Sequence, residues 1–218
     1  MRFEKEYYKG VRYSLKQQLI KRYVLEIIEW ASEISKSNLL NGQGKKALDV
    51  GCAYGYAAEV LELLGYETFG IDISKYGVKQ AKKNCSGDFL VCDAQSSLSF
   101  KSETFDLVTC FDVLEHLQYP IKSIENMFEV CKNVIICTTP NRAVEKPVRK
   151  VMREFDKTHI NVRLPSEWKR SIQSKLKCKL LKVETFYELT PRIADKLLFF
   201  KSFKVPYGGL TIRILVEK

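Results

Sequence analysis

Short apolar runs alternate with segments of helical spacing from about residue 45 onward. The runs predict five strands, over 47–50, 67–73, 88–92, 105–111 and 134–138. Between them, spacing and end signals predict helices over 57–64, 74–84 and 120–131. Ser74 suits the N-cap of the second helix, and Pro120 suits the first turn of the third. Strands joined by such crossovers form a parallel sheet with helices on both faces.

The two ends of the chain have different patterns. Apolar residues recur at helical spacing from 18 to 34, and the glycine-containing stretch 41–44 then breaks the pattern. We therefore expect a helical preface over 1–44 and one domain over 45–218. Two late strands, 180–189 and 210–216, predict an antiparallel hairpin at the sheet edge. The expected fold is α/β and doubly wound, with a mostly parallel seven-stranded sheet and this C-terminal edge hairpin.

Residues 191–209 lie between the two late strands and mix lysines with dense apolar residues. Such a segment could form a lid, a dimer face or a patch that binds a membrane surface. The expectation is an amphipathic helix that covers the sheet.

A turn with two glycines follows the first predicted strand, in the sequence Asp-Val-Gly-Cys-Ala-Tyr-Gly over 49–55. Glycine allows a ligand to approach the backbone closely, and the helix beyond offers unpaired N–H groups. Asp72 ends the second strand, 21 residues after Gly51 (72 − 51). An acid at that distance suits a ribose diol. The pattern predicts a nucleoside-binding crevice.

The same turn resembles the first motif, Asp-x-Gly-x-x-x-Gly, of the class I S-adenosylmethionine (SAM)-dependent methyltransferases. A dinucleotide fingerprint, Gly-x-Gly-x-x-Gly, would need glycine where the chain has Ala53 and Tyr56, which argues against NAD. The resemblance covers roughly residues 45–218. It implies a Rossmann-like sheet and SAM as the cofactor.

The resemblance assigns cofactor contacts to successive strand ends. Asp49 would attract the ammonium of SAM, Asp72 would accept from both ribose hydroxyls, and Asp93 would accept from the adenine amino group. Ile73 would pack on the adenine face. The full expected set is Asp49, Gly51, Cys52, Ala53, Gly55, Asp72, Ile73, Asp93, Ala94 and Phe111. Each carboxylate taken alone could equally cap a turn or face solvent.

The only two histidines of the chain, His116 and His159, are the candidate catalytic residues. The segment Asp-Val-Leu-Glu-His-Leu over 112–117 recurs in a branch of the family that methylates small molecules, lipids and glycans. Residues 156–159, Asp-Lys-Thr-His, resemble another segment of that branch. A histidine at the open end of the sheet could act as a general base for an alcohol or phenol. Either histidine could instead be structural.

A variant of this hypothesis involves a metal. Asp112, Glu115, His116 and His159 resemble the Glu-x-x-Glu-His…His set that holds magnesium in small-RNA 2′-O-methyltransferases. Asp112 is one methylene shorter than the glutamate of that set, so we predict no metal ligands. An RNA ribose methyltransferase with a metal-assisted site is the alternative function. A SAM-binding protein without catalysis is another.

Composition and charge limit the classes of molecule that this protein is expected to bind. The net charge is +10, but the lysines are scattered, so nucleic acid is possible and a small-molecule acceptor is favoured. The seven cysteines form no Cys-x-x-Cys pair, which predicts reduced core residues and a cytoplasmic protein. No apolar run approaches the ~20 residues of a membrane span, and no signal peptide is expected. The oligomeric state and the acceptor stay open. Guesses for acceptor contacts are Arg12, Tyr13, Lys16 and Trp168.

Overall fold

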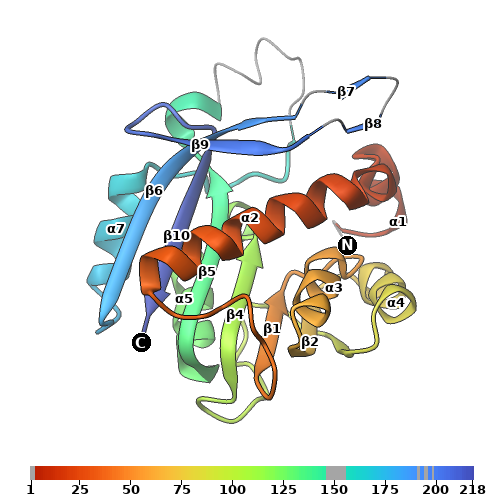
Figure 1. The fold of residues 1–218 in the computed structure, drawn as a ribbon, viewed down its shortest axis with the longest axis horizontal. Coiled ribbons are helices and arrows are strands. Elements are labelled where there is room, and N and C mark those ends of the chain that lie inside the picture. Colours follow the sequence, from red (N-terminus) through yellow and green to blue (C-terminus); the bar gives the residue numbers. More distant parts are fainter. Residues whose placement is uncertain (1–2, 146–155, 191, 194–195, 198) are drawn as a thin grey trace.

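Five parallel strands form the first part of one sheet in the computed structural model, which describes residues 3–145, 156–190, 192–193, 196–197 and 199–218 (Figure 1). They are β1 (Lys46–Val50), β2 (Glu67–Asp72), β3 (Asp88–Val91), β4 (Phe105–Phe111) and β5 (Cys131–Pro140). Their order in the sheet is β3-β2-β1-β4-β5. The chain therefore leaves β1 on one side and returns beside it on the other, and the reversal opens a crevice at the carboxyl ends of β1 and β4.

The helices cover both faces of the sheet. One face packs against α5 (Pro120–Val130) and α7 (Pro165–Gln173), and the other packs against α2 (Gln17–Ser35) and α3 (Tyr56–Leu63). Alternate residues of the strands supply the two cores, as with Leu48 on one face and Ala47 on the other. α4 (Lys75–Asn84) follows β2, and its N-cap Ser74 accepts from the N–H of Gly77. The expected strands and helices are thus present, with ends that differ by a few residues.

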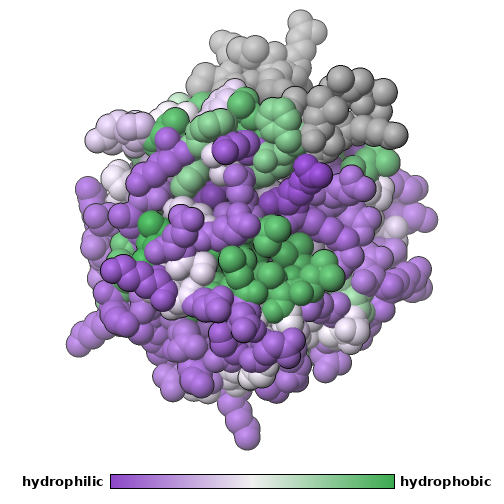
Figure 2. Space-filling view, in the orientation of Figure 1, coloured by the Kyte–Doolittle hydropathy of each residue, from purple (hydrophilic) through white to green (hydrophobic). Residues whose placement is uncertain are grey.

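α2 is amphipathic and joins the preface to the sheet. Its buried residues are Val24, Ile27, Ile28, Trp30 and Ala31. Its exposed residues, Gln18, Arg22, Leu25, Glu29 and Glu33, also recur at intervals of three and four. Figure 2 shows that the face on which α2 lies is largely hydrophilic, with a smaller hydrophobic area near its centre. The division into 1–44 and 45–218 stays a prediction.

The C-terminal edge is antiparallel but differs from a simple hairpin. β10 (Thr211–Glu217) lies between β5 and β6 (Leu180–Leu189) and pairs with both. β9 (Lys201–Val205) then adds to the far side of β6. The sheet has eight strands rather than the expected seven.

The helix expected over 191–209 is wrong. The described residues of this segment form β7 (Arg192–Ile193), β8 (Lys196–Leu197) and β9, while 191, 194–195 and 198 lie outside the described residues. The edge of β6 offers a row of unpaired backbone groups, and pairing with β9 satisfies them. The apolar content of residues 191–209 does not by itself show that the edge of β6 needs a pairing strand.

Besides α7 and the strands β7, β8 and β9, three short helical elements in the described residues were not predicted. α1 (Lys5–Gly10) and the 3-10 helix η1 (Tyr13–Lys16) precede α2, and a second 3-10 turn, η2 (Leu114–His116), follows β4. α1 packs through Tyr8 on Tyr54 and Tyr76 of the neighbouring loop and helix. Among the described residues, no helix is both long and apolar enough to span a bilayer.

Replacement of Leu215, a fully buried residue of β10, tests the position of that strand in the core. Leu215→Ala should lower the free energy of unfolding by about 2–5 kcal/mol, because it removes buried methyl groups and leaves a cavity. The matched control is Leu63→Ala on α3, because the side chain of Leu63 is 78% exposed. This variant should change the free energy of unfolding by about 0.5 kcal/mol or less. Urea denaturation measures both. Equal losses would contradict the central placement of β10.

Candidate functional site

A cavity of about 870 Å³ opens at the carboxyl ends of the parallel strands. The loops after β1, β2, β3 and β4 line one part of it, and residues between 3 and 24 line another. The other described lining residues are Pro140, Glu145, Asp156, His159, Ile160, Leu210 and Thr211. Every expected cofactor residue except Gly55 lines this cavity, as do both histidines. The strand order therefore brings together residues that are far apart in the sequence.

The turn after β1 needs glycine for two packing reasons. Gly51 has φ +79°, and a Cβ there would lie 2.2 Å from Cγ2 of Val113, in the loop after β4. Gly55 also has φ +79°, and its Cβ would lie 2.8 Å from Sγ of Cys85. Both positions exclude a side chain, since left-handed φ is strained for other residues. Gly51 lies on the cavity wall, whereas Gly55 lies behind it against α4.

Asp72 joins the loops after β1 and β2. Its carboxylate accepts from the N–H groups of Ala53 at 2.8 Å and Ser74 at 2.7 Å. Burial raises the pKa of Asp72, although these two hydrogen bonds oppose the shift. A carboxylate has about four acceptor sites, so the two backbone bonds leave capacity for a ligand.

Asp49 is a deeply buried acid of the cavity, with 2% of its surface exposed. It accepts a hydrogen bond of 2.8 Å from Oγ1 of Thr109. Burial raises the pKa of Asp49 to about 7, the Thr109 bond opposes the rise, and the charge of Asp72 adds to it. Two acids this close favour a cation between or beside them.

The third strand end carries Asp93, which is partly buried. Its Oδ1 accepts from the backbone N–H of Gln95 at 2.9 Å. Ile73 is 44% exposed and lines the cavity near it. Three carboxylates at the ends of β1, β2 and β3 therefore face one cavity, in the arrangement that the sequence predicts.

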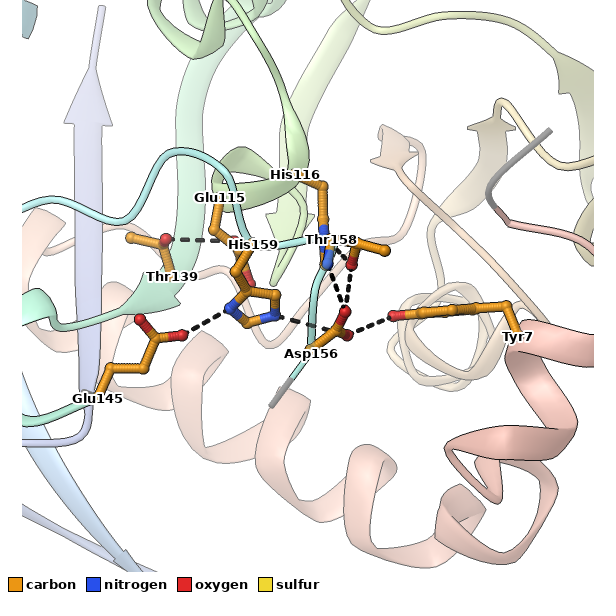
Figure 3. Close-up of polar contacts among 8 residues, drawn as sticks. All are labelled: Tyr7, Glu115, His116, Thr139, Glu145, Asp156, Thr158 and His159. Atoms are coloured by element: carbon orange, nitrogen blue, oxygen red, sulfur yellow. Dashed lines mark hydrogen bonds and ion pairs between the residues drawn. The ribbon is translucent and has the colours of Figure 1, made fainter. Parts of the chain in front are cut away.

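Two histidines that line the same cavity lie beside each other (Figure 3). The rings of His116 and His159 pack edge to face, with centroids 4.6 Å apart. Nδ1 of His116 is 2.8 Å from Oγ1 of Thr158, and Nδ1 of His159 is 2.7 Å from Oε1 of Glu145. Each ring makes a hydrogen bond through Nδ1, and Nε2 of His159 also lies 3.8 Å from Oδ2 of Asp156.

Glu115 lies beside the histidines and is 1% exposed. Its Oε2 accepts from Oγ1 of Thr139 at 3.2 Å, whereas Oε1 has no hydrogen-bond partner in the described part of the chain. Burial raises the pKa of Glu115 well above its ordinary value, and the charge of Asp112 adds to the shift. Glu115, His116 and His159 offer ligand atoms within 4.8 Å of one another. Asp112 is outside this group, and its carboxylate accepts from Thr138.

Several cavity residues were missed by the sequence analysis. Phe3, Tyr7 and Tyr8 reach the cavity from the N-terminal segment, and the hydroxyl of Tyr7 donates to Asp156 at 3.2 Å. Tyrosines cluster in the sequence at 7, 8 and 13, but their spacing alone does not indicate that their side chains face a cavity.

The guesses for acceptor contacts have mixed outcomes. Tyr13 and Lys16 line the cavity, whereas Arg12 does not. Trp168 is fully buried in the core beneath α7, with the Arg163 guanidinium over its ring, so it is a packing residue. Trp168 follows Pro165 in the first turn of α7, and this position on a helix is consistent with a packing role.

Comparison with known proteins supports this geometry. A family model described as a methyltransferase domain matches residues 48–136. The ubiquinone biosynthesis O-methyltransferase of Actinobacillus pleuropneumoniae is 30% identical over 113 residues, which are 47% of this chain and 48% of that protein. The mitochondrial protein of the same name from Schizosaccharomyces pombe is 34% identical over 95 residues, covering 41% and 35%. The matches thus span about half of these relatives or less.

Solved structures share the fold over nearly the whole chain. A SAM-dependent methyltransferase from Archaeoglobus fulgidus superposes with a TM-score of 0.72 at 19% identity, covering 97% of this chain and 100% of that one. The magnesium protoporphyrin IX methyltransferase of Synechocystis, solved with bound S-adenosylhomocysteine, has a TM-score of 0.62 at 17% identity, covering 91% and 83%. At these identities the likeness establishes the architecture.

The titration of Asp49 gives a prediction about the ligand-free protein. A carboxyl whose pKa is raised on folding contributes stability that is fully present below its unfolded pKa of about 3.9 and is lost as the pH rises to about 7. We expect the free energy of unfolding of the wild type to fall over this window relative to Asp49→Asn. Asparagine keeps an oxygen for Thr109 but does not titrate.

Urea denaturation at several pH values measures this difference. Thr109→Val is the control for the hydrogen bond itself. The free energy of unfolding should still differ in a pH-dependent way between the Thr109→Val variant and the double variant that carries both Thr109→Val and Asp49→Asn. Parallel pH profiles of the wild type and Asp49→Asn would contradict the raised pKa.

Proposed function

We propose that this chain, whose residues 48–136 match a family model described as a methyltransferase domain, transfers the methyl group of SAM to an oxygen of a small-molecule, lipid or glycan acceptor. The observation that carries the proposal is the continuity of one cavity from the three carboxylates at strand ends to the paired histidines. Its volume of about 870 Å³ is near the upper end of ordinary ligand sites, which suits a cavity that holds a donor and an acceptor together.

The donor end of the cavity fits SAM. Asp49 and Asp72 are buried acids close to each other, and a ligand that brings positive charge offsets the cost of ionising them. In our assignment Asp49 attracts the ammonium, Asp72 accepts from the ribose hydroxyls and Asp93 accepts from the adenine amino group. Ile73, half exposed beside them, covers the adenine face. When bound, SAM supplies a methyl group that is already activated by the sulfonium.

Oxygen is the proposed acceptor atom because the two relatives compared above are O-methyltransferases by name. Aromatic side chains from the N-terminal segment, among them Phe3, Tyr7 and Tyr23, line the cavity and would contact an apolar or aromatic acceptor. The edge of the Phe3 ring packs on His116, with centroids 5.2 Å apart. This places an apolar wall next to the proposed base.

The residues perform the reaction mainly by positioning. A histidine nitrogen accepts the proton of the acceptor hydroxyl while the oxygen forms a bond to the methyl carbon. The carbon–sulfur bond breaks and its electron pair stays on sulfur, so the products are a methyl ether, S-adenosylhomocysteine and a protonated histidine that returns its proton to water. Such a base contributes typically 10²–10⁴-fold, and alignment of the two reactants contributes the rest.

A second candidate function is favoured by one observation, the orphaned Oε1 of Glu115 beside both histidines. A divalent cation held by Glu115, His116 and His159 would satisfy that oxygen and would bind an acceptor with vicinal hydroxyls, such as the terminal ribose of an RNA. The chemistry of these donors fits such an ion. A SAM-binding protein without catalysis remains the alternative outcome of the tests below.

We further infer a cytoplasmic setting, because all seven cysteines are unpaired and four of them are buried. The same argument supports a reducing compartment for the activity.

Binding of SAM and of S-adenosylhomocysteine is the first test of the function. Asp72→Ala should weaken binding about tenfold to a hundredfold, because it removes acceptors from a buried diol. Asp88→Ala is the matched control, since Asp88 is exposed at the start of β3. Isothermal titration calorimetry measures the affinities. If the wild type binds neither compound, the proposal fails, and binding of NAD would revive a dehydrogenase.

Turnover of the histidine variants distinguishes a histidine that acts as a general base from histidines that hold a metal ion. If a histidine is the base, its alanine variant should keep the affinity for SAM and lose about 10²–10⁴-fold in kcat. If both histidines hold a cation, a chelator should abolish methyl transfer and Mg²⁺ or Mn²⁺ should restore it. Transfer of isotopically labelled methyl to acceptors from a cell extract provides the assay. Full activity in both alanine variants would exclude both roles.

A further inference from the structure

The hydroxyl of Thr158 lies between His116 and Asp156 (Figure 3). Its oxygen is 2.8 Å from Nδ1 of His116 and 2.5 Å from Oδ1 of Asp156. Both distances are within the range of O–H and N–H hydrogen bonds. A hydroxyl carries one hydrogen, so it donates one of these bonds and accepts the other.

Asp156 decides which bond the hydroxyl donates. Oδ1 also accepts from the backbone N–H of Thr158 at 2.8 Å, and Oδ2 accepts from the hydroxyl of Tyr7 at 3.2 Å. The backbone N–H can only donate, so Oδ1 acts as an acceptor toward Thr158, and the Thr158 hydroxyl makes a second contact with the same oxygen. The single hydrogen of Thr158 points to Asp156, which leaves its oxygen to accept from Nδ1–H of His116.

We propose that Thr158 and Asp156 are positioning residues that hold His116 in the tautomer protonated at Nδ1. In the neutral ring the lone pair then lies on Nε2, the nitrogen that is not used in the contact with Thr158. A base needs that lone pair, and so does a metal ligand. The inference deepens the proposed function, because it names the atom of His116 that takes the proton of the acceptor.

His159 provides an internal comparison. Its Nδ1 is 2.7 Å from Oε1 of Glu145, and a carboxylate accepts, so Nδ1 of this ring is protonated too. His159 thus meets carboxylates directly, Glu145 through Nδ1 and Oδ2 of Asp156 at 3.8 Å from Nε2, whereas Nδ1 of His116 meets Asp156 through the hydroxyl of Thr158. The closer Glu145 contact does not involve Thr158. Loss of the hydroxyl should change one ring and leave the other unchanged.

Tyr7 extends the arrangement to the N-terminal helix. Its hydroxyl binds the oxygen of Asp156 that Thr158 does not use, and Phe3 packs on the ring of His116. The N-terminal segment thus contacts both ends of the positioning chain, through Tyr7 of α1 and through Phe3, which precedes α1. The side chains that surround His116 in the described residues are Phe3, Glu115, Asp156, Thr158 and His159.

Nuclear magnetic resonance of the two histidines tests the tautomers without any substrate. The protein is labelled with ¹⁵N in histidine and treated with a chelator, at a pH well above the ordinary histidine pKa of about 6.5. Long-range ¹H–¹⁵N correlations distinguish a ring protonated at Nδ1 from one protonated at Nε2. With two histidines in the chain, His116→Ala assigns both rings.

In the wild type we expect both rings to be protonated at Nδ1. Thr158→Val keeps the shape of the side chain without the hydroxyl, and it should shift His116 toward the Nε2-protonated form while His159 stays unchanged. Thr158→Ser restores the hydroxyl and should restore the wild-type pattern. A wild-type His116 protonated at Nε2, or a tautomer in Thr158→Val that does not change, would overturn the inference.

Turnover of the same variants separates this inference from the proposed function. Thr158→Val should lower kcat at least tenfold with an unchanged affinity for SAM, and Thr158→Ser should recover most of it. If the tautomers are as expected but the wild type transfers no methyl group, the proposed function fails and the tautomer assignment stands. If the enzyme is active and Thr158→Val keeps the wild-type kcat, the positioning role is wrong.

Discussion

The site depends on how one cavity accommodates several carboxylates that repel one another. Threonine hydroxyls hold four of them, in the pairs Thr109 with Asp49, Thr138 with Asp112, Thr139 with Glu115 and Thr158 with Asp156. Asp72 is held instead by two backbone N–H groups. A hydroxyl donor fixes a carboxylate without introducing a positive charge, so the cavity keeps its preference for cationic ligands. A cavity of this kind suits a donor molecule that carries a sulfonium and an ammonium.

Glu115 is the exception among these acids. One of its oxygens is held by Thr139 and the other is buried without a donor in the described residues. Burial and the neighbouring Asp112 both raise the pKa of Glu115. A protonated Glu115 or a bound cation would each relieve this cost, and the chelator experiment distinguishes the two. Whether this oxygen is protonated or binds a cation therefore decides between the two candidate functions.

Both ends of the chain build the walls around this chemistry. α2 is tied to the C-terminal edge, since Nε1 of Trp30 donates to Glu184 at 3.1 Å and Glu26 accepts from the N–H of Ser202 at 3.1 Å. The same helix continues back through η1 to α1, which carries Tyr7 and Tyr8 to the cavity. The late strands thus help to set where the N-terminal aromatic residues stand. The proposed acceptor contacts of the N-terminal segment therefore lie outside residues 48–136, the region that matches the family model.

The sequence by itself determined the parallel core and the three carboxylates at its strand ends. These depend on local patterns: apolar strands, helix caps, and a turn with two glycines. Only the tertiary structure decided the pairing of His116 with His159, the contact of Tyr7 with Asp156, and the placing of β9 on the edge of β6. Each of these joins segments distant in sequence, and no local periodicity encodes which distant partner satisfies a hydrogen-bonding group. Trp168 shows the same limit, since whether an aromatic residue fills the core or faces a ligand depends on what packs above it.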